Sequence, residues 1–248
     1  MCIRDSSYSL NADFIRDRTL VEAERIGDIY RKRYESDKTK YSLFNRGELF
    51  MDTTFERDLI KKLRKTGIHS SLADQRILEV GCGDGRRLRD LQRLGADPQL
   101  EYGIELLDFY VEDAGNLSSN CHIQQGNAAA LPYKDGSFDI VYQRTVFTSI
   151  FDIGVKRKIA LEMRRVLAHD GFIIWYDFRM NNPGNPDVRG IKKAEISELF
   201  PDCDIQFKRV TLAPPLARTL APYSWLVCYL LEKLPFLRTH YLGIIKKR

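Results

Sequence analysis

A cluster of glycines directly after a short apolar stretch constrains this sequence more than any other feature. Arg76 to Val80 is predicted to form a strand, Gly81-Cys82-Gly83-Asp84-Gly85 a tight loop, and Arg86 to Leu94 a helix that ends at Gly95. Glycine lets the backbone approach a ligand closely, and the first turn of a helix offers free N–H donors. The loop is therefore expected to hold a carboxylate or phosphate of a cofactor; the alternative is a strand-helix turn with no ligand.

An acidic residue at the end of the next predicted strand favours the ligand-binding alternative. Glu105 ends the stretch that begins at Leu100, and it lies 20 positions after Gly85. At that spacing a carboxylate can accept hydrogen bonds from both hydroxyls of a ribose. Loop and acid together predict a nucleoside site.

Strands and helices alternate along most of the chain, which predicts a parallel sheet with helices on both faces. Val155 to Leu167 has one apolar side and is predicted to be a helix, followed by a turn at His169-Asp170-Gly171, and Lys192 to Phe200 is a shorter helix. The predicted strands are Arg76–Val80, Leu100–Glu105, His122–Gln125, Phe138–Tyr142, Phe172–Tyr176, Ile205–Leu212 and Tyr241–Ile245.

The N-terminal part of the chain lies outside this alternating pattern. Residues 1–10 are expected to be a disordered or artefactual leader. Residues 11–70 are charged and read as a helical cap, with apolar positions such as Leu20, Ile26 and Tyr30 spaced for one helix face.

Residues 71–248 are expected to form a single α/β domain that ends in a basic segment. From Ile205 onward there are eight Lys and Arg residues against one acidic residue, a net charge of +7. A proline-punctuated insert, 213–238, precedes the last strand and is predicted to contain a helix at about Tyr223 to Leu234. That helix is expected to pack on the core; the alternative is a surface helix resting on anionic lipid.

Composition narrows the class of protein further. The 248 residues are 44% hydrophobic and carry a net charge of +5, which is too mild to call for nucleic acid. The five cysteines are scattered and never spaced as Cys-x-x-Cys, so neither a disulfide framework nor a metal site is expected. We expect a cytoplasmic protein, because no signal peptide is visible and the longest apolar run, Trp225 to Leu231, is far shorter than the roughly 20 residues that span a bilayer.

The spacing of the glycines separates two classes of nucleoside cofactor. Dinucleotide-binding enzymes use Gly-x-Gly-x-x-Gly, whereas this chain has Gly-x-Gly-x-Gly followed by two arginines. The run Ile77–Gly85 instead resembles the first signature of class I S-adenosylmethionine-dependent methyltransferases, in particular the type 11-like group. Later signatures of that family are matched in order by Gly126–Tyr133, Ser137–Val141, Arg165–Leu167 and Gly171-Phe172. The resemblance implies a Rossmann-like sheet of seven strands, mostly parallel, with the last strand antiparallel.

The same resemblance implies a role for each residue that matches a family signature. The glycine loop and the acid before it would hold the amino-acid end of S-adenosylmethionine, Glu105 the ribose, and Leu106 the adenine face. Asn127 stands where the family usually has aspartate, and its side-chain oxygen can accept from the adenine amino group. Ala128 would donate its backbone N–H, and Gln143 would line the methyl end unless it is a satisfied strand-end residue. The implied cofactor-binding residues are Glu79, Gly81, Cys82, Gly83, Gly85, Glu105, Leu106, Asn127, Ala128 and Gln143.

The segment after the fifth predicted strand is the candidate acceptor wall, because open α/β sheets bind ligands beyond the carboxyl ends of their strands. It is dense in hydrogen-bonding side chains, and Tyr176, Arg179 and Asn181 are predicted to contact the acceptor. A solvated loop is the alternative. Asp177 and His240 are the candidate bases for a hydroxyl acceptor, by residue type and position.

The acceptor class rests on a second resemblance. With Tyr41–Asn45 and Thr211–Ala217 included, the chain is similar to bacterial methyltransferases found among glycan-assembly genes. This implies methyl transfer to a small molecule or glycan, lipid-linked acceptors included, with oxygen as the receiving atom. DNA is disfavoured because no Asn-Pro-Pro-aromatic signature follows the fourth strand. The alternatives are a non-catalytic binding or scaffold protein, an RNA methyltransferase and an NAD-dependent oxidoreductase, and a peripheral contact with the inner membrane is left open.

Overall fold

The structure, a computed structural model, describes residues 6–35, 41–182 and 184–248. Its strands are β1 (Ile77–Val80), β2 (Glu101–Glu105), β3 (His122–Gln125), β4 (Phe138–Arg144), β5 (Leu167–Phe178), β6 (Cys203–Leu212) and β7 (Arg238–Lys247). They form one sheet in the order β3-β2-β1-β4-β5-β7-β6. The first five are parallel, and β7 runs antiparallel to both of its neighbours. The predicted Rossmann-like sheet with an antiparallel last strand is confirmed.

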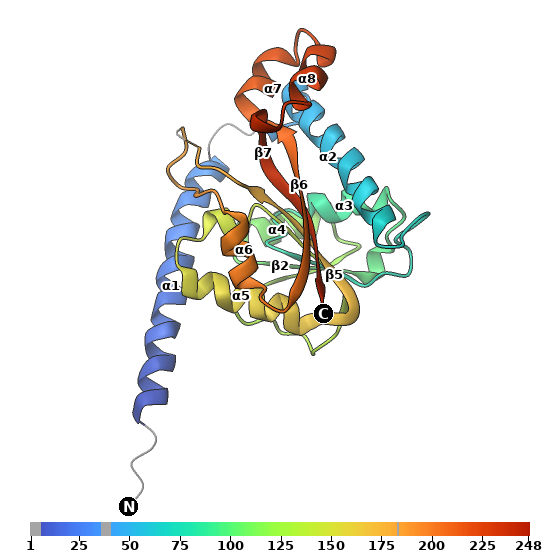
Figure 1. Cartoon of the computed structure of the whole chain (residues 1–248). Coiled ribbons are helices and arrows are strands. Elements are labelled where there is room, and N and C mark those ends of the chain that lie inside the picture. Colours follow the sequence, from blue (N-terminus) through green and yellow to red (C-terminus); the bar gives the residue numbers. More distant parts are fainter. Residues whose placement is uncertain (1–5, 36–40, 183) are drawn as a thin grey trace, which may run out of the picture.

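Helices cover both faces of this sheet (Figure 1). They are α1 (Ser6–Glu35), α2 (Arg46–Lys65), α3 (Arg86–Gln92), α4 (Asp108–Leu117), α5 (Ile153–Val166), α6 (Lys193–Leu199), α7 (Pro214–Leu220) and α8 (Trp225–Glu232). Helices α2 and α3 contribute to the core on one face, and α5 and α6 to the core on the other.

The pleat of β4 shows why the sheet needs helices on both sides. Ile140 and Tyr142 belong to the core under α2 and α3, whereas Val141, between them, belongs to the core under α5. Successive side chains of a strand point to opposite faces, so a continuous apolar strand buries both. Helix α5 begins where the Asp152 carboxylate accepts from the backbone N–H of Val155, and α2 begins at an equivalent cap by Asn45.

Several local expectations differ from the structure. The expected turn at His169-Asp170-Gly171 lies inside β5, where Gly171 sits so close to β4 that a Cβ would be 2.6 Å from the Asp139 carbonyl oxygen. Helix α4 was not predicted, because its sequence carries no apolar stripe and buries only Ala114. The C-terminal insert forms two helices, α7 and α8, rather than one.

The N-terminal part of the chain, expected to be a leader and a helical cap, contains two helices. Residues 6–10 of the expected leader belong to α1, and residues 1–5 lie outside the described part of the chain. Helix α1 runs along one side of the molecule and α2 across the sheet, and α2 joins α7 and α8 at one end (Figure 1). Within the described residues, no helix is both long and apolar enough to cross a membrane.

Candidate functional site

A cavity of about 400 Å³ opens at the carboxyl ends of β1, β2 and β4, with α1 along its wall. Six of the ten predicted cofactor-binding residues line it: Gly81, Gly83, Glu105, Leu106, Asn127 and Ala128. They come from three loops that are separate in sequence. The parallel sheet brings these loops together because the carboxyl ends of its strands share one edge.

The glycine loop needs glycine at two of the positions that line the cavity. Gly81 and Gly83 have φ of 68° and 55°, a left-handed conformation that other residues rarely adopt. A Cβ on Gly81 would lie 2.7 Å from Cγ2 of Val146, so this position has no room for a side chain. A Cβ on Gly83 would meet no atom within 4 Å. Gly83 therefore leaves open space where a ligand can reach the backbone.

Glu105 ties the end of β2 to the glycine loop. Its Oε2 accepts from the Gly83 N–H at 2.9 Å, and its Oε1 accepts from the Leu107 N–H at 3.0 Å. Burial raises the pKa of this carboxyl, and these backbone donors act in the opposite direction. Each carboxylate oxygen has a second lone pair, so Glu105 can still accept from two ribose hydroxyls.

Asn127 and Ala128 form the opposite part of the wall. The Asn127 Oδ1 accepts from the Ala129 N–H at 2.9 Å, which closes a short turn after β3. The side-chain oxygen keeps one lone pair for a ligand donor. Together with Leu106 these residues combine hydrogen-bonding groups with an apolar side chain in one wall of the cavity.

Glu79 lies beneath the cavity rather than in its wall. The side chain is buried in β1, and its Oε2 has no hydrogen-bond partner among the described residues. Burial holds the pKa of this carboxyl well above its ordinary value, although Arg87 and Arg144 act in the opposite direction. Glu79 is therefore not among the residues that line the cavity.

The other three predicted cofactor residues also lie outside the cavity wall. The Cys82 sulfur packs against Gly103 of β2, and Gly85 packs so closely that a Cβ would be 2.5 Å from Ser118 Oγ. Gln143 is buried, and its Oε1 accepts from the Val146 N–H at 3.2 Å. These residues support the glycine loop and the segment after β4 from the side that faces away from the cavity.

Neither predicted base faces the cavity. Asp177 is buried and accepts from the backbone N–H groups of Phe147 and Thr148, at 3.0 Å and 3.2 Å, and from the Thr148 hydroxyl at 2.5 Å. His240 is buried too, with its ring stacked on Tyr176 at 4.7 Å between centroids. Asp177 thus holds the turn after β4, and His240 fills space between strands.

The three predicted acceptor residues are likewise engaged elsewhere. The Tyr176 hydroxyl pairs with Thr211 Oγ1 at 2.9 Å in the core. Arg179 donates to the carbonyl oxygen of Arg238 at 2.6 Å, and Asn181 Oδ1 accepts from the Gly190 N–H at 2.9 Å. The segment after β5 is therefore a folded loop bound to β7, and none of these side chains lines the cavity.

The burial of His240 gives a testable pH dependence. Burial holds the pKa of the imidazole well below its ordinary value of 6.5. A group whose pKa is lowered by folding gives stability above its unfolded-state pKa and loses it as the pH falls towards the folded-state pKa. We expect the free energy of unfolding of the wild type to fall below pH 6.5, by up to about 1.4 kcal/mol per pH unit relative to His240→Phe.

Urea unfolding of both proteins on either side of that pH checks this prediction. Asp177 acts in the opposite sense, because burial raises its pKa to about 7 and its contribution is lost as the pH rises through that value. It is present in both proteins, so the difference between them isolates His240. Parallel pH profiles for the two proteins would contradict a buried, neutral imidazole.

Residues that were not predicted to belong to the site complete the cavity wall. Glu22, Ile26 and Tyr30 of α1 line it, and the Tyr30 hydroxyl is 2.8 Å from Ser149 Oγ. Thr145, directly after β4, also lines it and has a φ of 59°. A β-branched residue in that conformation is strained, and such strain gathers at functional sites. The helical spacing of Ile26 and Tyr30 was visible in the sequence. It did not show which surface of the protein these side chains would cover.

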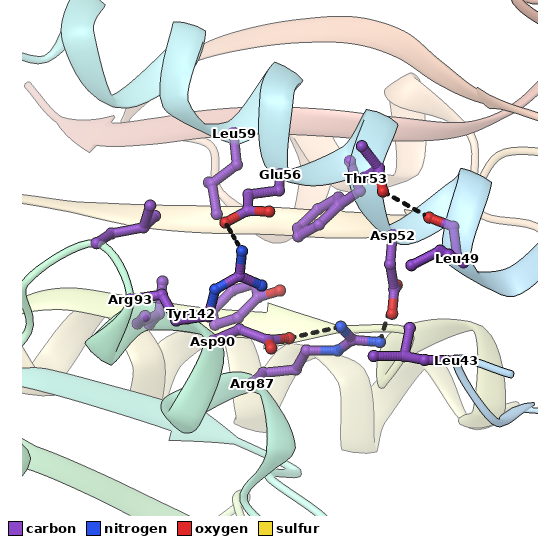
Figure 2. A pocket seen from close by; sticks show the side chains of 13 residues that line it. Leu43, Leu49, Asp52, Thr53, Glu56, Leu59, Arg87, Asp90, Arg93 and Tyr142 are labelled. Atoms are coloured by element: carbon purple, nitrogen blue, oxygen red, sulfur yellow. Dashed lines mark hydrogen bonds and ion pairs between the residues drawn. The ribbon is translucent and has the colours of Figure 1, made fainter.

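A second, smaller cavity of about 220 Å³ lies between α2 and α3. Figure 2 shows the Arg87 guanidinium between Asp52 and Asp90, with Tyr142 at the base. Asp52 accepts from Arg87 at 3.2 Å, from Arg144 at 3.0 Å and from Arg86. The charged side chains of this cavity are thus paired with one another, and the ion pairs tie α2 to α3 and to β4.

Comparisons with known proteins agree with this fold. Residues 78–175 match the model of the methyltransferase domain family. The chain is 31% identical over 110 residues to an uncharacterized methyltransferase, YcgJ of Bacillus subtilis, which covers 42% of this chain and 41% of that one. It is 32% identical over 133 residues to a phthiotriol/phenolphthiotriol dimycocerosates methyltransferase of Mycobacterium ulcerans, covering 51% and 46%. The chain therefore spans about half the length of these relatives.

Solved structures show the same fold at low sequence identity. YcgJ of Bacillus subtilis superposes with a TM-score of 0.53 at 17% identity, over 78% of this chain and 98% of that one. Phosphoethanolamine N-methyltransferase 1 of Haemonchus contortus, in complex with phosphoethanolamine and S-adenosylhomocysteine, gives 0.63 at 15% identity, over 93% and 50%. The fold is that of an α/β domain with a cavity at the carboxyl edge of its sheet. With the family match, residues 78–175 are a class I S-adenosylmethionine-dependent methyltransferase domain, whose cofactor is S-adenosylmethionine.

Proposed function

We propose that this protein transfers the methyl group of S-adenosylmethionine to a hydroxyl oxygen of a small molecule or glycan, lipid-linked acceptors included. The observation that carries the proposal is the cavity in which Gly81, Gly83 and Glu105 meet at the carboxyl edge of the sheet. Its open position at Gly83 and its carboxylate at Glu105 fit the two ends of an adenosyl amino acid. Glu105, Leu106, Asn127 and Ala128 would hold the nucleoside, and the glycine loop the amino-acid end.

The protein's part in the reaction is mainly alignment. The sulfonium of the cofactor supplies an already activated methyl group, so an acceptor oxygen needs to be placed in line with it rather than activated by covalent catalysis. Thr145 and Val146 lie beside Gly81, and α1 covers the cavity with Ile26 and Tyr30. These residues would exclude water and fix the acceptor, while Asp177 and His240 support the fold.

The spacing of the glycines disfavours a nicotinamide cofactor. A dinucleotide loop, Gly-x-Gly-x-x-Gly, needs its third glycine where the helix packs closely against the strand. In this chain Arg86 stands at that position, and its side chain donates to the Tyr41 carbonyl oxygen and to Asp52. The name of the Mycobacterium ulcerans relative identifies a lipid acceptor for that protein, which supports a lipid-linked acceptor for this one.

We further propose that the enzyme works in a reducing bacterial cytoplasm. Cys82, Cys121, Cys203 and Cys228 are free thiols, and three of the four are buried. Free, buried thiols persist where no oxidising machinery pairs them. The acceptor would then be reached on the cytoplasmic side of the inner membrane.

Turnover tests the acceptor class. Purified protein incubated with S-adenosylmethionine is expected to form S-adenosylhomocysteine faster with a hydroxyl-bearing sugar or lipid-linked glycan than without one, as measured by mass spectrometry. The matched control is the Glu105→Gln variant, which should form no S-adenosylhomocysteine either with or without the acceptor. A methylated RNA product, with no product from any hydroxyl-bearing glycan, would overturn the proposed acceptor. No product from any acceptor, with the cofactor bound, would support a non-catalytic protein instead.

A further inference from the structure

The outer face of α8 is apolar and exposed. Leu226 and Leu230, four residues apart and therefore on one face of α8, are 69% and 53% accessible. Tyr223, in the turn before α8, is 86% accessible, and Phe236, in the short turn after it, is 65% accessible. Large apolar side chains are thus exposed on α8 and at both of its ends, where a helix packed on the core would carry polar residues.

The inner face of the same helix packs against the rest of the protein. Trp225 and Tyr229 pack edge-on against Phe50 of α2, with ring centroids 5.5 Å and 5.0 Å apart. Cys228 and Glu232 are buried, and Glu232 accepts from Arg57 at 3.0 Å. Helix α8 is therefore held in a fixed orientation that presents its outer face, so the exposure does not come from an undocked helix.

Positive charge surrounds this apolar face. Arg46 donates to the carbonyl oxygen of Pro222, Arg179 to that of Phe236 and Arg238 to that of Glu232, so these three guanidinium groups are held by backbone oxygens. Lys233 is exposed at the end of α8. The acids nearest in sequence, Glu48 and Glu232, are paired with Arg218 and Arg57. The local charge is positive and not neutralised within the described residues.

Only part of the basic C-terminal segment contributes to this charge. Lys246, Lys247 and Arg248 lie at the far end of β7, where Lys246 and Lys247 are paired in register with Asp204 and Cys203. Lys208 is bonded to Asp58 at 3.1 Å. The charge that matters for α8 is thus the local group of Arg46, Arg179, Lys233 and Arg238 rather than the total of +7.

The apolar face is linked to the cofactor cavity by a short path. Tyr41 lines the cavity, and its backbone carbonyl accepts from Arg86 at 3.2 Å. Phe44, three residues later, is fully exposed, and Arg46 then bonds to Pro222, next to Tyr223. Figure 1 shows the start of α2 beside α7 and α8 at one end of the molecule.

We propose that the exposed face of α8, with Leu226 and Leu230, and the exposed Tyr223 and Phe236 at its two ends bind the surface of an anionic lipid bilayer. An apolar helix face bordered by Arg and Lys is the pattern of helices that lie in the membrane interface. The basic group would attract anionic headgroups, and the apolar side chains would enter the acyl boundary. This contact would hold the protein where a lipid-linked acceptor is found, and in that respect it extends the proposed function.

Vesicle flotation tests the proposal without any turnover. Wild-type protein is expected to float with vesicles of phosphatidylglycerol and phosphatidylcholine, less with phosphatidylcholine alone, and less in high salt. The double variant Leu226→Ser, Leu230→Ser is expected to lose at least about tenfold in vesicle affinity, because two apolar side chains no longer enter the lipid. The matched control is Leu161→Ser on α5, an exposed leucine outside the apolar face, which should float like the wild type.

Two further measurements keep the outcomes distinct. Binding of S-adenosylhomocysteine by each variant reports an intact fold, and it tests the proposed function separately from membrane contact. Wild-type protein that stays in the soluble fraction with anionic vesicles, or a double variant that floats as well as the wild type, would overturn the proposal. So would light scattering that shows a wild-type dimer and a monomeric double variant, because a second copy would then cover the face.

Discussion

Glu105→Gln is expected to weaken the binding of S-adenosylhomocysteine by about 100-fold or more, because the charged acceptor for two ribose hydroxyls is lost. The remaining amide oxygen can still accept, but the amide N–H₂ that replaces the other oxygen faces donors rather than acceptors. In the structure these donors include the Gly83 and Leu107 N–H groups that bond to the carboxylate. Isothermal titration calorimetry with the wild type and the variant measures the difference directly.

The control for this variant lies on the same strand. Glu101, at the other end of β2, is buried and accepts from Gln92 at 2.7 Å, and burial raises its pKa to about 7. Glu101→Gln makes the same change of atoms away from the cavity, so it is expected to leave the affinity within about twofold of the wild type. Equal affinities for all three proteins would exclude Glu105 from the cofactor site.

Gly83→Ala is expected to abolish measurable cofactor binding, a loss of at least about 100-fold. The reason is the open space at this position, where a Cβ would meet no protein atom within 4 Å and would project towards the bound ligand. The left-handed backbone at Gly83 adds a cost of about 1 to 2 kcal/mol for any residue with a Cβ. Calorimetry and thermal unfolding separate the two effects.

Gly136→Ala provides the matched control for Gly83→Ala. Gly136 has a φ of 67°, and its nearest Cβ contact would be an ordinary one, 3.9 Å from the Ala168 Cα. It lies in the turn before β4, outside the cavity wall. This variant should therefore lose a similar amount of stability and keep its cofactor affinity. Normal affinity of Gly83→Ala would show that the ligand does not approach the backbone at that glycine.

The sheet and the glycine loop were predictable because both depend on local sequence. Short apolar stretches bounded by glycine, such as Ile77–Val80, fit buried parallel strands, and the loop after them carries its own backbone requirement. Glu105 was found by its distance from that loop along the chain. Helix α4 was missed because only Ala114 of its residues is buried, so no apolar periodicity marks it.

The acceptor residues could not be placed from sequence because they depend on which way each strand-end side chain points. Tyr176 and Asp177 lie on β5, and β5 pairs with β7, which follows it by about sixty residues in the chain. That pairing places Asp177 opposite Tyr241 and turns the Tyr176 hydroxyl to Thr211. Strand register of this kind is set by tertiary packing, which the local pattern does not contain.

The part of the cavity wall that α1 contributes could not be predicted from the sequence, because it too depends on tertiary packing. Glu22 accepts from the backbone N–H of Phe151, and Tyr30 contacts Ser149, more than a hundred residues further on. The helical spacing of these positions was visible, but their partners lie in the segment after β4. Leu20 was also expected on that face, but more than half of its surface is exposed to solvent.

Titration of the purified wild-type chain with S-adenosylhomocysteine and, separately, with NAD tests whether the cavity binds S-adenosylmethionine. We expect micromolar binding of S-adenosylhomocysteine at one site per chain and no detectable binding of NAD. A folded protein that binds NAD, or that binds neither ligand, would contradict the assignment of this cavity to S-adenosylmethionine.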